Sequence, residues 1–307
     1  MTESMAPKRF LPTSFGNIAY YETGSAAAPP VLFVHGIPTS GYLWRHVLRF
    51  LQNDFHGYAP DLMGLGDTQV DSKTGRFDMD AQAEMLLEFM TALGHEQFTL
   101  VCHDQGGAAA QAIAARQPDR VRCLVLTDCV CYDNWPVPTV VRFQRLSRIP
   151  LLGDALSRLG VTEWIETRTP LSSMLRGVHD RSRFPVEAMR EYLRPLREGP
   201  ESRARFRQFL LAGHPRYTEL AVEGLRRFDK PTMVLWAADD AYLSPSWGKK
   251  LMEDIPGATR FELIPFCGHF WPEERPSEFA SHIGAFLAEH LLVQEDEDED
   301  AVTAEGA

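Results

Sequence analysis

Asp104 is the residue of this chain that is best placed for covalent chemistry. It lies in the sequence His103-Asp104-Gln105-Gly106-Gly107, between the strand-forming run 98–102 and an alanine-rich run with helical character. This order predicts a strand, a sharp turn and a helix, with the aspartate at the apex of the turn. A carboxylate there can displace a leaving group from a saturated carbon and form an ester, which water can hydrolyse. The apex residue therefore predicts a hydrolase that works through a covalent intermediate.

Two more residues could activate the water that such an ester needs. His269 follows a predicted strand near the end of the chain, and the acidic pair Asp239-Asp240 follows the strand before it. A histidine that is oriented by a carboxylate can remove a proton from water. We expect Asp240 to be this carboxylate, because it lies four residues after Trp236 and five before Pro245, at the apex of its loop. Asp239 is expected to be a solvated neighbour.

Backbone N–H groups could stabilise the oxyanion that forms when water attacks the ester. The apolar run 31–34 predicts a buried strand that ends in His35-Gly36-Ile37-Pro38. A loop of this kind can turn a backbone N–H toward the site, although an ordinary tight turn has the same sequence character. We expect the oxyanion hole to consist of the N–H groups of Ile37 and Gln105.

The elements that must position these residues predict an α/β fold. Helices are expected over 43–51, 79–93 and 276–292, and they alternate with strands that are expected as a pair within 9–23 and singly over 31–34, 55–59, 98–104, 121–126, 231–236 and 260–264. This alternation predicts a mostly parallel, eight-stranded sheet with helices on both faces and with functional residues at the carboxyl ends of the strands.

The middle of the chain has a different pattern. Between 132 and 228 the strand-like runs disappear, and short helical patterns take their place at 137–146, 161–168, 185–193 and 202–211. We therefore expect a core formed by 1–131 and 229–292, with an inserted helical lid over 132–228.

Charge and composition narrow the partners. The chain has 307 residues and a net charge of -11, which argues against nucleic acid or an anionic membrane as the main partner. Residues 295–300 are consecutive acids and predict a disordered tail over 293–307. The first ten residues lack the apolar core of a signal peptide, and no apolar run approaches membrane-spanning length. These observations favour a cytoplasmic protein.

The cysteines indicate neither disulfides nor a metal site. Their number is odd and no CxxC spacing occurs, which favours buried thiols in a reducing compartment. The pair Cys129 and Cys131 has no second pair nearby, so we expect no metal and no cofactor. The cysteines are Cys102, Cys123, Cys129, Cys131 and Cys267.

Several stretches resemble one branch of the α/β-hydrolases, that of the haloalkane dehalogenases and epoxide hydrolases. They are HGIPTSGYLWR at 35–45, APDLMGLGDT at 59–68, HDQGG at 103–107, PDRVRCLVL at 118–126 and YLRPLREGPESRARFRQF at 192–209. The similarity covers 9–292 and implies an α/β-hydrolase fold with Asp104 as nucleophile, His269 as base and Asp240 as acid. Related enzymes also place the acid after another strand, where this chain has Asp128, so Asp128 is the alternative.

The leaving-group contacts depart from the dehalogenase pattern. Similar dehalogenases hold the halide between a tryptophan just after the nucleophile and either an asparagine in the HGxP loop or a lid tryptophan. This chain has Gln105 and Ile37 at the first two positions. Gln105 retains a side-chain N–H donor, and Trp135 and Trp164 could supply a second donor or simply pack.

Epoxide hydrolases of the branch protonate the opening ring with lid tyrosines. Tyr192 and Tyr217 are the candidates here, with Tyr132 at the entry to the predicted lid. The resemblance favours a dehalogenase-like enzyme that acts on a small apolar organic substrate with water. The alternatives are an epoxide hydrolase, a binding or receptor protein without turnover, and an ester hydrolase. The last is disfavoured because carboxylate attack on an acyl carbon gives an anhydride.

Overall fold

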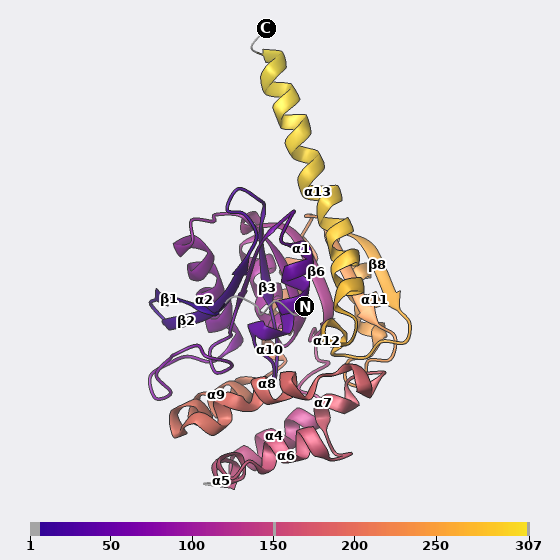
Figure 1. The fold of residues 1–307 in the computed structure, drawn as a ribbon. Coiled ribbons are helices and arrows are strands. Elements are labelled where there is room, and N and C mark those ends of the chain that lie inside the picture. The colour runs from indigo at the N-terminus through magenta and orange to yellow at the C-terminus, as the bar shows by residue number, and fades with distance from the viewer. Residues whose placement is uncertain (1–6, 150–151, 306–307) are drawn as a thin grey trace.

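A computed structural model describes residues 7–149 and 152–305, and it contains an eight-stranded sheet covered by helices (Figure 1). The strand order is β1-β2-β4-β3-β5-β6-β7-β8. The strand β2 runs antiparallel to both of its neighbours, and the pairings from β4 to β8 are parallel. The predicted mostly parallel eight-stranded sheet is thus confirmed. The strands are β1 (Arg9–Thr13), β2 (Gly16–Thr23), β3 (Pro30–Val34), β4 (His56–Pro60), β5 (Phe98–Asp104), β6 (Val121–Cys129), β7 (Thr232–Ala237) and β8 (Ala258–Ile264).

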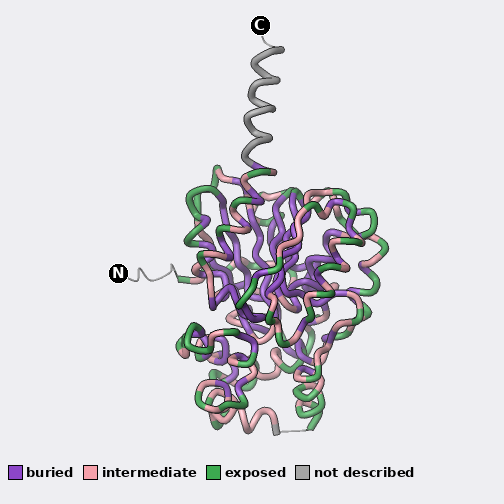
Figure 2. The backbone as a smooth tube through the Cα atoms, turned by 90° about the vertical axis from the view of Figure 1, so that its right-hand side faces the viewer, coloured by how far each residue is buried: buried purple, intermediate pink, exposed green. Residues whose placement is uncertain are grey.

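Alternate residues of the central strands enter two separate hydrophobic cores, as the period of a strand requires. In β3, Leu32 and Val34 face one core, whereas Val31 and Phe33 face the other. Both cores are buried, and Figure 2 shows buried backbone through the middle of the molecule. A strand that is covered on both faces must be apolar at every position, which is why 31–34 reads as a continuous hydrophobic run.

Helices from distant parts of the chain close the two cores. The first core is covered by α2 (Met79–Ala92), α3 (Gly106–Arg116), α10 (Arg216–Leu225) and α11 (Pro245–Asp254). The second is covered by the 3-10 helix η1 (Gly41–Trp44), α1 (Arg45–Leu51), α12 (Trp271–Glu274) and α13 (Pro276–Glu305). The single helix predicted over 43–51 is thus two elements, because the chain tightens into a 3-10 turn before α1 begins.

Most of the helices between β6 and β7 form a separate layer below the core in Figure 1, which we call the cap. It consists of α4 (Pro138–Ser147), α5 (Leu152–Arg158), α6 (Val161–Arg168), α7 (Ser173–Arg176), α8 (Val186–Glu198) and α9 (Pro200–Ala212), with the 3-10 helix η3 (Arg181–Arg183). Helices α7 and α8 of the cap share a small hydrophobic cluster around Met174, Met189 and Leu193.

The end of the predicted lid differs in the structure. The lid was expected to continue to 228, but α10 packs against α3 of the core, and its residues Tyr217, Ala221 and Leu225 belong to the first core. An amphipathic pattern identifies a helix but not the surface on which its apolar face packs. We therefore propose that the cap ends with α9.

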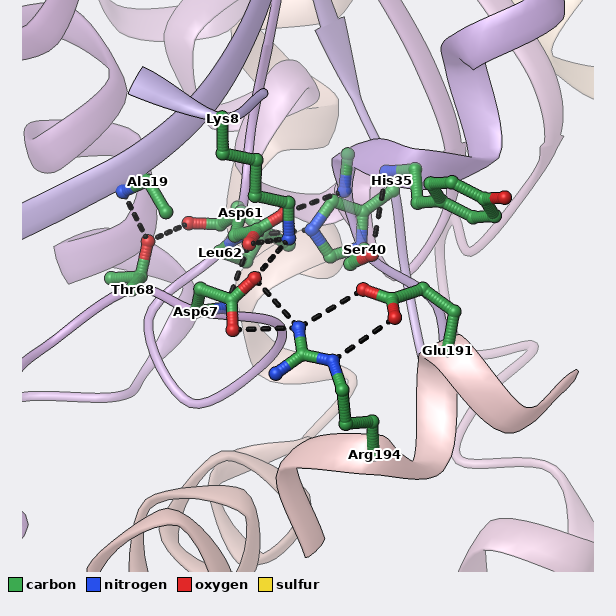
Figure 3. Close-up of polar contacts among 12 residues, drawn as sticks. Lys8, Ala19, His35, Ser40, Asp61, Leu62, Asp67, Thr68, Glu191 and Arg194 are labelled. Carbon is green, nitrogen blue, oxygen red and sulfur yellow. Dashed lines mark hydrogen bonds and ion pairs between the residues drawn. The ribbon is translucent and has the colours of Figure 1, made fainter. Parts of the chain in front are cut away.

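A cluster of charged groups joins the cap to the core (Figure 3). Lys8 Nζ lies 2.6 Å from an Asp61 oxygen and 2.7 Å from an Asp67 oxygen. Arg194 of α8 reaches the same Asp67 carboxylate at 2.7 Å and also pairs with Glu191 at 2.9 Å. Asp67 therefore receives one cation from the N-terminal segment and one from the cap.

The last helix continues beyond the packed core. Within α13, residues Phe279, Ile283 and Phe286 are buried, and the helix runs on to Glu305. The sequence predicted a disordered tail over 293–307, and the helical backbone through 305 differs from that prediction. Residues 306–307 of that predicted tail lie outside the described residues.

None of the helices in the described residues is long and apolar enough to cross a membrane.

Candidate active site

Asp104 lies at the apex of a tight turn between β5 and α3. Its φ of 51° is in the left-handed region, which is uncommon for a residue with a side chain and is often found at functional sites. The turn is closely packed, since a Cβ on Gly106 would lie 2.4 Å from the carbonyl oxygen of His35. Small residues around the apex let β5 and α3 approach while the Asp104 side chain points into the site, as a nucleophile elbow requires.

The structure brings Asp104, His269 and Asp240 together from three different loops. His269 Nε2 lies 3.4 Å from Asp104 Oδ2, and His269 Nδ1 lies 2.8 Å from Asp240 Oδ2. The other oxygen of Asp240 accepts hydrogen bonds from the backbone N–H groups of Tyr242 and Leu243 at 2.7 and 2.9 Å. The imidazole is therefore held between two carboxylates, and one of these is itself fixed by its own loop.

The charges within this group shift one another's pKa values. Burial favours neutral forms, but the charge of Asp240 and the contacts with Asp104 raise the pKa of His269 above its ordinary value. Burial also opposes ionisation of Asp104, yet its hydrogen bond to His269 and the histidine charge lower the pKa of Asp104. Both shifts therefore favour a carboxylate beside an imidazolium in the free site.

The two other candidate acids lie elsewhere. Asp239 is about half exposed and pairs with His179 at 2.8 Å. Asp128 is buried and accepts hydrogen bonds from the Ala237 backbone N–H and the Trp271 indole. The geometry thus associates Asp240, rather than Asp128, with His269.

Two backbone N–H groups approach the Asp104 carboxylate, as expected for an oxyanion hole. Ile37 donates its N–H to Asp104 Oδ1 at 2.7 Å, and a hydrogen bond from the Gln105 backbone contributes to the low pKa of Asp104. His35 stabilises the loop that carries Ile37, because its Nε2 accepts the N–H of Leu62 at 3.0 Å and its Nδ1 lies 3.0 Å from the Gly36 carbonyl. Burial lowers the pKa of His35 to about 4, so this histidine stays neutral.

A cavity of about 960 Å³ lies next to Asp104, between the core and the cap. Its walls are mostly apolar, and Ile37, His269 and Phe270 line it on the core side. A volume near 1,000 Å³ is at the upper end of the range for small-molecule sites. The arrangement can hold a large apolar compound with one atom against the Asp104 carboxylate.

The predicted leaving-group residues do not line this cavity. Trp135 is buried in the first core, where its indole N–H donates to Thr218 at 2.8 Å, and Trp164 is largely exposed on α6. Sequence alone could not distinguish a packing tryptophan from one that faces a ligand. Neither tryptophan therefore lies where the sequence predicted a leaving-group contact.

The tyrosine predictions fail for a similar reason. Tyr192 donates its hydroxyl to Glu273, which also binds Arg45, so it stabilises the contact between cap and core. Tyr217 packs in the first core, with its hydroxyl bound by Arg216. Gln105 also lies outside the cavity lining: its side chain is buried beside the nucleophile, and its Oε1 finds no hydrogen-bond partner in the described part of the chain.

Two residues near the site escaped sequence reasoning. Tyr242 lines the cavity, and its ring lies edge-on to the His269 ring at a centroid distance of 5.3 Å. His103 packs against His269, with the two ring centroids 4.6 Å apart, and His103 Nε2 lies 2.8 Å from the His269 carbonyl oxygen. Their positions beside Asp240 and Asp104 in the sequence are the signals that could have identified them.

The described residues contain no group of three or more His, Cys, Asp and Glu side chains that could hold a metal ion. All five cysteines are free and buried.

An elbow aspartate, a histidine and a loop acid at the carboxyl ends of parallel strands are features of the α/β-hydrolase fold. The family described as alpha/beta hydrolase fold matches residues 29–276, and the chain belongs to it. Haloalkane dehalogenase 2 of Mycobacterium bovis is 29% identical over 279 residues, covering 90% of this chain and 93% of its own. Epoxide hydrolase 3 of Xenopus tropicalis is 26% identical, covering 89% and 75%.

Solved structures share the fold. A loop variant of a haloalkane dehalogenase from Bradyrhizobium elkanii superimposes with a TM-score of 0.74, covering 94% of this chain and 99% of its own, at 23% identity. That likeness shows the fold alone. The protein is thus an enzyme of the α/β-hydrolase family.

Proposed function

We propose that this enzyme cleaves carbon–halogen bonds of apolar substrates through an alkyl ester on Asp104. The observation that carries the proposal is the position of the Asp104 carboxylate, which lies at the floor of an apolar cavity with Ile37 N–H on one oxygen and His269 near the other. A serine in this position would form an ether that water cannot hydrolyse, whereas the aspartyl ester can be hydrolysed.

In the first step Asp104 Oδ2 attacks the carbon that bears the halogen. The C–O bond forms as the carbon–halogen bond breaks, and the halide leaves with the bonding electron pair. The N–H of Ile37 holds Oδ1 at 2.7 Å, which leaves Oδ2 as the attacking atom. Oδ2 lies on the side of the carboxylate that faces His269.

In the second step water attacks the carboxyl carbon of the Asp104 ester. His269 takes a proton from this water, and Asp240 stabilises the imidazolium that results. The negative charge develops on the oxygen that faces the N–H groups of Ile37 and Gln105, where one donor is typically worth about 3 kcal/mol. The alcohol leaves with the proton from His269, and Asp104 is restored.

Epoxide opening is the second candidate, and the chemistry of its leaving group makes it less favoured. A halide departs without a proton, but the epoxide oxygen needs an acid. Tyr242 is the only tyrosine among the described residues that line the cavity, and its hydroxyl donates to the carbonyl of Ser173. Burial raises the pKa of Tyr242, which makes it a weaker acid.

The trapped ester tests the proposal. His269→Gln is expected to form the ester and fail to hydrolyse it, so incubation with a 1-bromoalkane should add one alkyl group to the intact mass. Peptide mapping should place the group on Asp104, and Asp104→Asn should acquire none. A parallel incubation with an epoxide of equal chain length should give no adduct.

Wild-type enzyme should release bromide from the bromoalkane at a rate that exceeds diol formation from the epoxide. An adduct with the epoxide alone would replace dehalogenation by epoxide hydrolysis. Turnover by the wild type without an adduct in His269→Gln would overturn the covalent mechanism. Binding of either compound without product, at any pH, would instead indicate a receptor that retains the three residues.

A further inference from the structure

The cavity above Asp104 is rich in cationic side chains. Arginines enter its lining from three cap helices, namely Arg142 and Arg145 from α4, Arg176 from α7, and Arg203 and Arg207 from α9. The whole chain carries a net charge of -11, so this concentration of positive charge opposes the overall balance. A cleft lined by one sign of charge raises the local concentration of oppositely charged ligands.

The carboxylates of the cap lining neutralise only part of this charge. Asp154 pairs with Arg203, so the charge of Arg203 is already neutralised. Glu166 accepts hydrogen bonds from the hydroxyls of Ser172 and Ser173 at 3.0 and 2.8 Å, and so it stabilises the start of α7. The side chains of Arg142, Arg145, Arg176 and Arg207 make no ion pair with any carboxylate among the residues whose side chains are described.

Three of these arginines come from α4 and α9, two helices that pack against each other, and we call Arg142, Arg145 and Arg207 the rim arginines. All three are exposed to solvent. Arg207 Nε donates to the carbonyl of Ser147 at 2.6 Å, which fixes its stem beside the end of α4 and leaves its terminal NH₂ groups free for a ligand. Asp104, in contrast, has only 13% of its side chain exposed.

The cavity between the rim arginines and Asp104 is large and apolar. Its volume of about 960 Å³ far exceeds what a short haloalkane fills, and Val140, Ile165, Leu193 and Leu210 are among its lining residues. A ligand that uses the whole space must carry a long apolar body from the exposed rim to the buried nucleophile.

We propose that the substrate is an amphipathic organic anion, with a carboxylate on the rim arginines and an apolar chain whose reactive carbon reaches Asp104. Guanidinium groups bind carboxylates through charge-assisted, often paired hydrogen bonds, which a neutral alkyl halide cannot form. The reaction of the apolar end with Asp104 rests on the function proposed above. The binding of the carboxylate by the rim arginines does not depend on turnover.

Binding of dodecanoate, compared with dodecan-1-ol below the micellar range, tests the anion site directly. Isothermal titration of the wild-type protein at low salt should show about tenfold tighter binding of dodecanoate, and the difference should shrink at high salt. The combined variant Arg142→Gln, Arg145→Gln, Arg207→Gln should lose this preference and keep its affinity for the alcohol. The matched control is Arg148→Gln, because Arg148 is exposed at the end of α4 but does not line the cavity.

Several results would overturn the proposal. One is equal affinity for dodecanoate and dodecan-1-ol, and another is a loss of the preference for dodecanoate in Arg148→Gln that equals the loss in the rim variant. A third is a loss of this preference in Arg176→Gln but not in the rim variant. The last is binding to anionic phospholipid vesicles in place of monomeric dodecanoate. A turnover assay with 12-bromododecanoate and its methyl ester separates the two proposals. Tight, rim-dependent binding of dodecanoate without bromide release would support the anion site and overturn only the dehalogenation.

Discussion

Asp128 accepts a hydrogen bond from the indole N–H of Trp271, with 2.7 Å between Oδ2 and Nε1. Its other oxygen accepts the backbone N–H of Ala237 at 2.9 Å, so both carboxyl oxygens are occupied by donors of the fold. Burial, with the nearby charge of Asp240, raises the pKa of Asp128 well above its ordinary range. A carboxyl group held in this way does not orient His269, which contacts Asp240 instead.

Asparagine substitutions should therefore separate the two acids. Asp240→Asn is expected to reduce turnover by about four orders of magnitude, since the imidazolium loses its counterion and the correct tautomer is no longer favoured. Asp128→Asn should stay within about tenfold of the wild-type turnover but lower the free energy of unfolding by about 1–3 kcal/mol, because its NH₂ group faces a donor. Steady-state kinetics and urea unfolding measure the two effects, with Asp239→Asn as the control. A greater loss of turnover in Asp128→Asn would reverse the assignment.

Alkylation of Asp104 should release a proton from His269. In the free enzyme, the negative charge of Asp104 helps to keep the pKa of His269 high. The ester is neutral, so its formation should lower the pKa of His269 and convert the imidazolium into the base that the second step needs. Stopped-flow mixing with a pH indicator should detect a proton burst that coincides with ester formation. The burst should be absent in His269→Gln, and its absence from the wild type would show that His269 is already neutral before substrate binds.

The sheet, the elbow and the order of the three residues were predictable from the sequence because they depend on local patterns. The run 31–34 is apolar at every position since β3 is covered on both faces, and the strand, turn and helix around Asp104 are contiguous in the chain. The choice of Asp240 over Asp239 also followed from loop position, and Asp239 instead pairs with His179.

The cap side chains were not predictable in the same way. Trp135, Tyr192 and Tyr217 have the residue types that bind leaving groups, but each is used in packing or in contacts with distant residues. Which face of a cap helix meets the cavity depends on tertiary packing, and the amphipathic pattern of α8 or α10 does not specify its partner. Tyr242 was missed because its contact with His269 joins two loops that lie apart in sequence.

Asp67→Asn should weaken the attachment of the cap. Asp67 lies between Lys8 and Arg194 (Figure 3), and its loss leaves Arg194 with only its neighbours Glu191 and Glu198 on α8. We expect the free energy of unfolding at pH 7 to fall by about 1–2 kcal/mol, as measured by urea unfolding, since this pair is partly buried. The exposed pair of Arg76 and Glu84 is the control, and Glu84→Gln should change stability by less than about 0.5 kcal/mol.

The same variant has a defined pH dependence. Burial opposes ionisation of Asp67, but Lys8 and Arg194 lower its pKa below the ordinary 3.8. A lowered carboxyl pKa contributes stability above the unfolded pKa and loses it as pH falls through the folded value. The difference between wild type and Asp67→Asn should thus be largest at neutral pH and shrink below about pH 4. A difference that stays constant down to pH 2 would show that packing, rather than charge, holds the cap.

Gly36→Ala tests whether the oxyanion loop must touch the nucleophile. A Cβ on Gly36 would lie 2.1 Å from Asp104 Oδ1 and 2.5 Å from the Gln105 nitrogen, so the loop or the carboxylate must shift. The shift separates Ile37 N–H from Oδ1, and we expect turnover to fall by about a hundredfold or more, at a cost in stability of about 1–3 kcal/mol. Gly199→Ala is the control, because a Cβ there meets nothing within 4 Å, and it should retain turnover. Steady-state kinetics should be measured at a temperature at which both variants are fully folded. Turnover at the wild-type rate in Gly36→Ala would show that Asp104 reacts without the hydrogen bond from Ile37 N–H.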